Sequence, residues 1–319
     1  MSAISDKTKK TYESCLRSVL VDKKTHLVRF VLPDLHEMVD DVIAHIKEAH
    51  PPPNSQRVYL SAVMWKVQDD PSAWLKYKEY FDKLRVSADA QASSQTISEE
   101  KADNYVPWDD IEKAMETAYA DWINNKLSPE EYLMMALYTC IPPVRNDYCD
   151  MYVCYGFESD IEKRNYLVIG DITTPKGMMN ILDKELTPTL PMKFVFGDYK
   201  TFKRYGVKEL PITSRSLKNA IVLWLKDIDR KPRNQCHYTK SFHELFVWNK
   251  DGFAKKLQNL FLRYTGKPVG IDLLRRAYIT KFINDENPSI ARKKEIAEQM
   301  LHSYTVQEIY RIVDDSDSD

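Results

Sequence analysis

Six side chains in the second half of the sequence stand where chemistry could take place, at turns and at the ends of expected helices: Arg145, Lys200, Asp272, Arg275, His302 and Tyr310. Guanidinium and ammonium groups can bind an anion, and imidazole, lysine and phenol groups can transfer protons. Taken one at a time, each residue also has an ordinary structural interpretation. Arg145 after a Pro-Pro turn is typical of a surface ion pair, and Asp272 is typical of a helix N-cap.

The elements that must position these side chains are mostly helices. Apolar spacing and capping residues predict helices that begin at 108 and that cover 130–140, 214–229, 252–264, 273–284, 289–301 and 305–313. Ser128 and Glu131 form a predicted capping box before the second of these helices. Strand-like stretches cover 166–172, 193–201 and 209–212, and the last two flank a turn with Gly206. We therefore expect residues 105–319 to form a mixed α+β domain with a small antiparallel sheet.

The first ninety residues predict a separate four-helix domain, so the whole chain is expected to be mainly α. Its helices cover 5–20, 35–49, 56–67 and about 71–86, with Ser5 or Asp6 as the first cap and Asn54 or Ser55 as the third. A small, polar stretch follows. We predict domains at 1–90 and 105–319, joined by a linker over 91–104.

The composition of the 319-residue chain excludes several classes of protein. Only 8 residues are glycine, and no glycine-rich phosphate loop is found. The longest apolar run, 132–141, is about half the length that a bilayer requires. Five cysteines without CxxC spacing indicate reduced thiols in an intracellular protein. We expect no cofactor, no metal and no membrane association.

The charge of the chain is distributed unevenly. The formal net charge is -1, yet residues 184–280 hold 20 Lys and Arg against 8 Asp and Glu. A basic block of this kind is typical of a protein that binds a polyanion, although a solvated lysine-rich face is the ordinary alternative. Charge therefore favours nucleic acid as a partner without settling it.

The order of the six candidate residues resembles that of the tyrosine recombinases, most closely those of large DNA viruses and their mobile elements. The resemblance covers nearly the whole chain, including the segments 55–62, 137–148, 199–206 and 300–303 with Tyr310. In that family the active-site order is Arg, Lys, His-x-x-Arg, His or Trp, and then Tyr. Arg145, Lys200, Arg275, His302 and Tyr310 match five of these six positions.

The resemblance implies a role for each residue. Arg145 and Arg275 would hold the non-bridging oxygens of a DNA phosphodiester and stabilise the phenolate of Tyr310, the nucleophile. Lys200 would protonate the departing 5′ oxygen, and His302 would donate a hydrogen bond to the phosphate. The implied product is a 3′-phosphotyrosyl enzyme, which conserves the bond energy, so neither ATP nor a metal is required.

Two positions depart from the family pattern. Asp272 stands in place of the first histidine, where an ionised carboxylate cannot donate to a phosphate. It could accept the proton of Tyr310 or orient Arg275. Tyr148 stands where the family commonly has an acidic residue, and Asp147 or Asp150 could replace that residue. Two further alternatives remain open: Lys203 in place of Lys200 as the lysine, and Tyr304 in place of Tyr310 as the nucleophile.

The resemblance implies a site-specific recombinase or integrase in which a two-domain clamp grips duplex DNA and four protomers assemble on two sites. The N-terminal domain would then be the core-binding domain. The protein would work inside a cell, in a host nucleus or a cytoplasmic viral factory. The alternatives are a type IB topoisomerase, which relaxes DNA without exchanging strands, and a DNA-binding protein that has lost catalysis.

Overall fold

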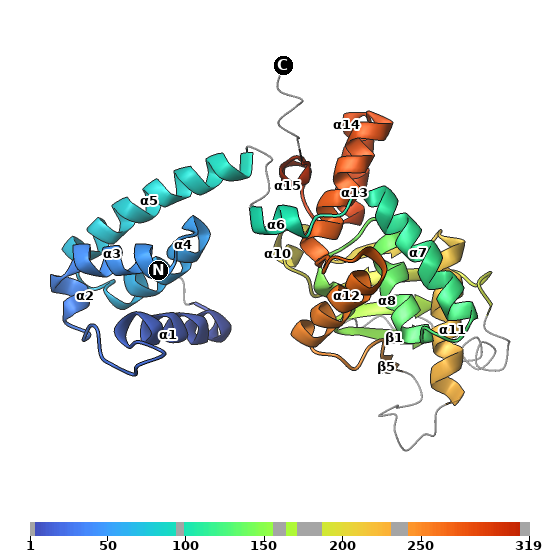
Figure 1. Cartoon of the computed structure of the whole chain (residues 1–319), viewed down its shortest axis with the longest axis horizontal. Helices are drawn as coiled ribbons and strands as arrows, with labels where there is room; N and C mark the ends of the chain where they lie inside the picture. Colours follow the sequence, from blue (N-terminus) through green and yellow to red (C-terminus); the bar gives the residue numbers. More distant parts are fainter. Residues whose placement is uncertain (1–3, 94–98, 156–163, 171–186, 231–241, 313–319) are drawn as a thin grey trace. The chain divides into compact units, whose positions relative to one another are not determined.

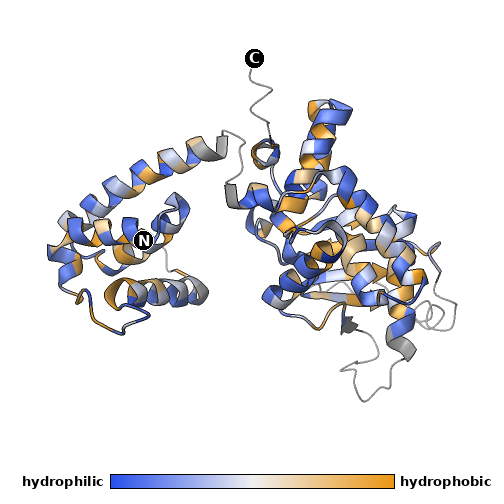
Figure 2. Ribbon diagram, viewed as in Figure 1, coloured by the Kyte–Doolittle hydropathy of each residue, from blue (hydrophilic) through white to orange (hydrophobic). Residues whose placement is uncertain are grey.

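The structure is a computed structural model that describes residues 4–93, 99–155, 164–170, 187–230 and 242–312. The chain divides into two compact units, Met1–Gln95 and Thr96–Asp319 (Figure 1). Each unit has a hydrophobic core of its own. The long helices carry both hydrophilic and hydrophobic residues (Figure 2), the pattern of elements with one face in a core.

The first unit is a helical bundle. Its helices are α1 (Asp6–Leu20), α2 (Asp34–Glu37), α3 (Val39–Ala49), α4 (Pro53–Lys66) and α5 (Pro71–Ser93). Ser5 caps α1 as predicted, because its side chain accepts from the backbone N–H of Thr8 at 3.2 Å. A buried tyrosine joins two helices, since the Tyr77 hydroxyl donates to the Leu35 carbonyl at 2.9 Å.

Three details of the first unit differ from the prediction. The helix expected over 35–49 is interrupted at Met38, which separates α2 from α3. Helix α4 begins at Pro53 rather than after an Asn54 or Ser55 cap, because proline fits the first position of a helix. Helix α5 continues to Ser93, into the predicted linker, and α6 (Glu99–Asp103) occupies the far end of that stretch.

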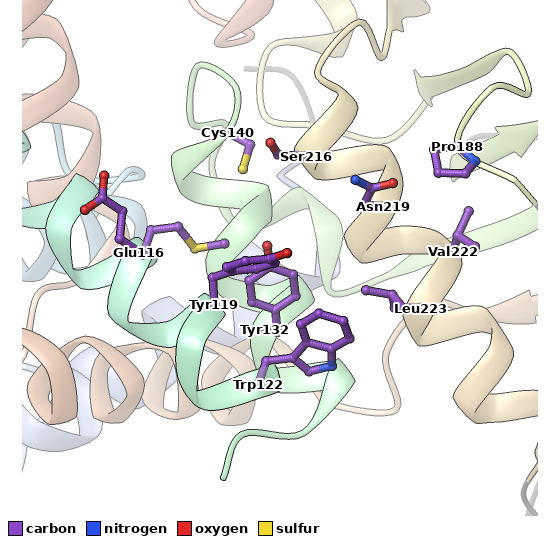
Figure 3. Close-up of a pocket in the computed structure, with 11 residues that line it drawn as sticks. Glu116, Tyr119, Trp122, Tyr132, Cys140, Pro188, Ser216, Asn219, Val222 and Leu223 are labelled. Carbon is purple, nitrogen blue, oxygen red and sulfur yellow. The ribbon is translucent and has the colours of Figure 1, made fainter. Parts of the chain in front are cut away.

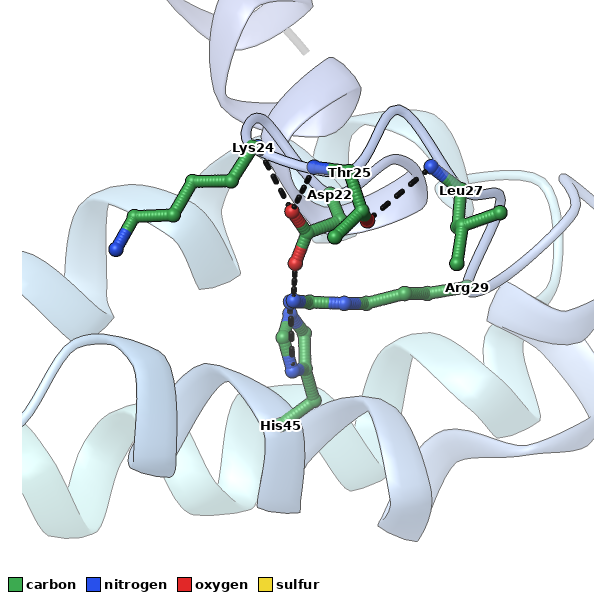
Figure 4. A network of polar contacts seen from close by, with 6 residues as sticks. All are labelled: Asp22, Lys24, Thr25, Leu27, Arg29 and His45. Carbon is green, nitrogen blue, oxygen red and sulfur yellow. Dashed lines mark hydrogen bonds and ion pairs between the residues drawn. The ribbon is translucent and has the colours of Figure 1, made fainter.

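The loop between α1 and α2 is fixed by a polar network (Figure 4). The Asp22 carboxylate accepts from the backbone N–H groups of Lys24 and Thr25 at 2.8 Å each and pairs with Arg29. Arg29 in turn donates to His45 of α3, with Nη1 2.9 Å from Nε2. These contacts attach the loop to the bundle.

The second unit combines helices with one small sheet, so the predicted fold class is confirmed. Its first helices are α7 (Trp108–Ile123) and α8 (Pro129–Thr139), and the capping box of Ser128 and Glu131 is present. The strands are β1 (Met151–Tyr155), β2 (Asn165–Ile169), β3 (Met192–Phe196), β4 (Lys208–Pro211) and β5 (Phe242–Glu244), in the order β4-β3-β2-β1-β5. The sheet is mixed rather than antiparallel throughout as expected, because β1 and β2 are parallel while the other described pairs are antiparallel.

Strands β2, β3 and β4 fall on the predicted strand-like stretches, although β3 ends at Phe196 rather than at 201. Strands β1 and β5 were missed by the sequence interpretation. Strand β1 is separated by two residues from a turn of 3-10 helix, η1 (Asn146–Tyr148), and β5 has only three residues, so neither gives a clear local alternation.

The remaining helices lie around this sheet and at one end of the unit. They are α10 (Phe202–Tyr205), α11 (Arg215–Arg230), α12 (Lys250–Thr265), α13 (Ile271–Glu286), α14 (Ile290–Gln299) and α15 (Tyr304–Tyr310). Helix α15 packs against α13 and α14 (Figure 1). Helix α14 stops short of the predicted 301, because Leu301 has a left-handed backbone with φ of 55°.

Candidate active site

A buried turn between α14 and α15 is the centre of the candidate site. The left-handed Leu301 reverses the chain there, and the His302 N–H closes the turn on the Ala297 carbonyl at 3.0 Å. The Leu301 carbonyl accepts from Arg145 Nη1 at 3.3 Å and from Thr201 Oγ1 at 3.2 Å. One peptide group therefore joins the Pro-Pro turn, the β3–β4 connection and the end of α14.

Arg275 is the most enclosed charged group of the site, with 1% of its surface exposed. Its Nη1 donates to the carbonyls of Pro143 and Met300 at 2.6 and 3.2 Å, and its Nη2 lies 2.7 Å from His302 Nδ1. Because a guanidinium has only donors, His302 Nδ1 must accept this hydrogen bond. The neutral ring of His302 therefore carries its proton on Nε2.

His302 is held in the neutral form. Burial, followed by the charges of Arg275 and Arg145, lowers the pKa of His302 to about 3. Its Nε2 and the Nε of Arg275 are buried, and neither has a hydrogen-bond partner among the described residues. These two unpaired N–H donors, one of them part of the Arg275 guanidinium, form a local environment that suits an oxyanion.

Tyr310 joins this cluster from α15. Its ring centroid lies 5.1 Å from the Arg275 Cζ, 5.3 Å from the Arg276 Cζ and 5.6 Å from the centroid of the His302 ring. Tyr304, the alternative nucleophile, is at the opposite end of the same short helix. The ring contacts with Arg275 and His302 thus belong to Tyr310.

Lys200 lies beside the site in an exposed connection. The strand expected to end at Lys200 ends at Phe196, so this lysine lies in the loop between β3 and α10. Its neighbour Thr201 donates to the Leu301 carbonyl, which attaches the loop to the central turn. The alternative, Lys203, is also exposed and lies within α10.

Asp272 lies in the first turn of α13, and its described contacts are to cations other than Arg275. Its Oδ2 accepts from Lys101 Nζ at 2.7 Å and from Arg276 Nε at 3.4 Å. Burial acts to raise the pKa of Asp272, but the hydrogen bond and charge of Lys101, together with Arg276, outweigh it and hold this pKa below its usual value. The carboxylate is therefore ionised.

Asp147, rather than Asp150, is the carboxylate that shares the interior of the site. Asp147 is buried in η1, and burial raises its pKa to about 6 against the opposing charges of Arg145, Lys250 and Arg275. Asp150 is exposed and pairs with Lys250 at 2.8 Å.

The structure thus brings Arg145, Arg275, His302 and Tyr310 together. Sequence reasoning missed Lys101, Arg276 and the anchoring role of Thr201. Arg276 is adjacent to Arg275 in the sequence, and this adjacency was the one signal that could have identified it. No comparable local signal marks Lys101.

A separate groove of about 570 Å³ lies between α7, α8 and α11. Tyr119, Trp122 and Tyr132 gather in it (Figure 3), with ring centroids 5.5 to 5.9 Å apart. None of the six candidate residues lines it.

Two other kinds of site were sought in the described parts of the chain. No group of three or more His, Cys, Asp or Glu residues there could hold a metal ion. No helix there is both long enough and apolar enough to cross a membrane.

Comparison with known proteins gives a distant structural likeness to a recombinase. No protein-family model and no curated protein matches the sequence. The crystal structure of XerA recombinase is similar to this chain with a TM-score of 0.40 and 14% sequence identity, over 98% of this chain and 89% of that chain.

Proposed function

We propose that this protein is a site-specific DNA recombinase or integrase of the tyrosine type, which cuts and rejoins duplex DNA through a 3′-phosphotyrosyl intermediate. One observation carries the proposal: Arg145, Arg275, His302 and Tyr310, from four separate segments, meet at one buried turn. A structural core has no need for two arginines, an unpaired imidazole N–H and a phenol at one place.

The geometry supports a division of labour at a scissile phosphodiester. Arg145 and the unpaired Nε of Arg275 supply positive charge and donors to the non-bridging oxygens, on which charge builds up in the transition state. The neutral His302 donates from Nε2 to the same phosphate. Its Nδ1 bond to Arg275 fixes the tautomer that this role requires.

The proposed reaction exchanges one phosphodiester for another. The Tyr310 oxygen forms a bond to phosphorus, the bond from phosphorus to the 5′ oxygen breaks, and the 5′ oxygen leaves as a hydroxyl. Lys200 supplies the proton for that hydroxyl, and the phenol proton passes to solvent or to a nearby carboxylate. The reverse reaction, with a 5′ hydroxyl as nucleophile, rejoins the strand without added energy.

The biological setting belongs to the same proposal. We propose duplex DNA as the partner, an assembly of four protomers on two sites, and a viral or mobile genetic element that works in a host nucleus or a cytoplasmic viral factory. The basic block of residues 184–280 supports the DNA partner.

The test is trapping of the covalent adduct. Wild type, Tyr310→Phe and Tyr304→Phe are incubated with a pool of nicked duplexes of randomised sequence, so that cleavage releases a short fragment and cannot be reversed. We expect denaturant-resistant protein–DNA adducts with wild type and Tyr304→Phe and none with Tyr310→Phe, although all three bind DNA. Peptide mapping should place the nucleotide on Tyr310.

An adduct that survives Tyr310→Phe would refute the nucleophile assignment. DNA binding by wild type without any adduct would instead favour the DNA-binding protein without catalysis. Plasmid relaxation in the absence of two-site strand exchange would identify a topoisomerase.

A further inference from the structure

We propose that Lys101, Asp272 and Arg276 form a charged clasp that positions Tyr310 for attack. Arg276 contacts the tyrosine, and the other two residues act through Arg276. The inference rests on the proposed role of Tyr310 as the nucleophile. It gives Asp272 a positioning role rather than a part in proton transfer.

Arg276 connects two helices through one guanidinium group. Its Cζ lies 5.3 Å from the centroid of the Tyr310 ring, and its Nη1 lies 3.5 Å from the Ile309 carbonyl, both on α15. Its Nε donates to Asp272 on its own helix. Only 16% of the Arg276 side chain is exposed. A partly desolvated guanidinium over an aromatic ring is among the stronger cation–π arrangements, so this contact can fix the ring.

Asp272 is itself held from two sides. It lies four residues before Arg276 on α13, the spacing at which helical side chains are neighbours. Lys101 comes from α6, outside that helix, and its ammonium lies 2.7 Å from the same carboxylate oxygen. The carboxylate therefore restricts the rotamers that Arg276 can adopt, and Lys101 restricts those of the carboxylate.

The orientation of Tyr310 depends on such contacts because α15 has only seven residues. A helix this short has little stability of its own. The Lys293–Glu308 pair at 3.1 Å attaches α15 to α14. Just after the end of α15, the Ile312 N–H donates to Thr280 Oγ1 of α13 at 2.9 Å. The clasp adds the contact at the tyrosine itself. Small misplacement of a nucleophile lowers the rate of attack more than it lowers substrate affinity.

The test measures rate and affinity separately in the full chain. On a nicked duplex that wild type cleaves, wild type is compared with Arg276→Met, Arg276→Lys, Lys101→Met, Asp272→Asn and the double variant Lys101→Met/Arg276→Met. The matched control is Lys113→Met, which breaks a Lys–Asp pair of 2.9 Å on the exposed face of α7. The readouts are the adduct rate at saturating DNA and the apparent Kd.

We expect Arg276→Met to lower the saturated rate on the order of 10- to 100-fold, as small misplacement of a nucleophile does. Lys101→Met should lower it by about fivefold, the upper range for an exposed ion pair. The Kd should stay within about twofold for both, as for the control. Arg276→Lys should recover part of the rate, and the double variant should be no slower than Arg276→Met alone.

The outcomes separate this inference from the proposed function. If wild type forms no adduct on any duplex, the proposed function fails. If wild type forms the adduct and Arg276→Met matches it, the clasp is refuted. Independent, multiplicative losses in the double variant would also refute a single clasp. Lys101 is half exposed, so its variant tests the idea even if Arg276→Met does not fold.

Discussion

At the scale of single residues, the pairing of Arg275 with His302 determines what each can do. Burial is the main force that lowers the pKa of both groups, and the positive charge of Arg275 adds to the effect on His302. The arginine keeps its charge, since even a lowered arginine pKa lies far above neutrality. The histidine stays neutral and becomes a hydrogen-bond donor of fixed tautomer rather than a proton source.

This pairing predicts a pH-dependent stability. The pKa of His302 is about 3 in the folded chain and near 6.5 in the unfolded chain, so between these values the unfolded state binds more protons. The stability that the neutral ring contributes is present above pH 6.5 and is lost as the pH falls. Between pH 7 and 5, wild type should lose about 2 kcal/mol more unfolding free energy than His302→Gln does.

Urea unfolding of both proteins at pH 7, 6 and 5 measures this difference. The control is His26→Asn, which replaces an exposed histidine. Its unfolding free energy should change with pH in parallel with that of wild type. Parallel curves for wild type and His302→Gln would show that His302 titrates normally in the folded chain.

At the scale of elements, the site is built from the interruptions between helices and strands. The Pro143, Met300 and Leu301 carbonyls, which accept from the two site arginines, lie at the ends of α8 and α14 or just beyond them. Peptide groups at such places lack partners within their own helix, and they can accept side-chain donors instead. The connection from β3 to β4 contributes Thr201 to the same cluster.

The two lysines in the segment between β3 and β4 are predicted to have different roles. Lys200 precedes the residue that bonds to the central turn, whereas Lys203 lies two residues beyond it on α10. Lys200→Ala should lower cleavage about 100-fold or more, because general acid catalysis contributes on that order. Lys203→Ala should change cleavage little.

A substrate with a 5′ sulfur in place of the leaving oxygen tests the chemical role. A thiolate leaves without protonation, since its pKa is lower. The sulfur substrate should therefore restore the rate of Lys200→Ala. Failure to restore it, or a greater loss with Lys203→Ala, would remove Lys200 as the general acid.

At the scale of the whole molecule, the positive charge is concentrated in one stretch of the chain. Residues 1–90 are nearly neutral, with 14 Lys and Arg against 13 Asp and Glu, and the rest of the chain is also nearly neutral as a whole, with 32 against 34. Within the second unit, however, the basic block of 184–280 holds 20 against 8. Affinity for DNA phosphates should therefore come mainly from the second unit.

Salt dependence of DNA binding tests this division. Because neutralised phosphates release counterions, the logarithm of affinity should fall linearly with the logarithm of salt concentration. The 96–319 fragment, which contains its own hydrophobic core, should keep most of the slope of the full chain but bind more weakly. The measurement is anisotropy on a duplex between 50 and 300 mM salt (about the range over which such slopes are measured).

A slope near zero for the fragment would contradict binding through the basic block. An affinity for the fragment equal to that of the full chain would contradict a contribution from residues 1–95.

The sequence by itself determined the mainly helical fold class, most helix positions and the order of the six candidate residues. These follow from local signals: apolar spacing along a helix, and caps such as Ser5 and the Ser128 box, whose partners lie within four residues. For the same reason, the resemblance in residue order was visible without any structure.

Only the tertiary structure decided the partners of those residues. Asp272 pairs with Lys101, 171 positions away, and the left-handed Leu301 presents its carbonyl to Arg145, 156 positions away. The parallel pairing of β1 with β2, which places Met151 opposite Asn165, is likewise a contact between separate segments. Burial and ion pairing depend on which segments meet in space, and no spacing within one helix or strand records that.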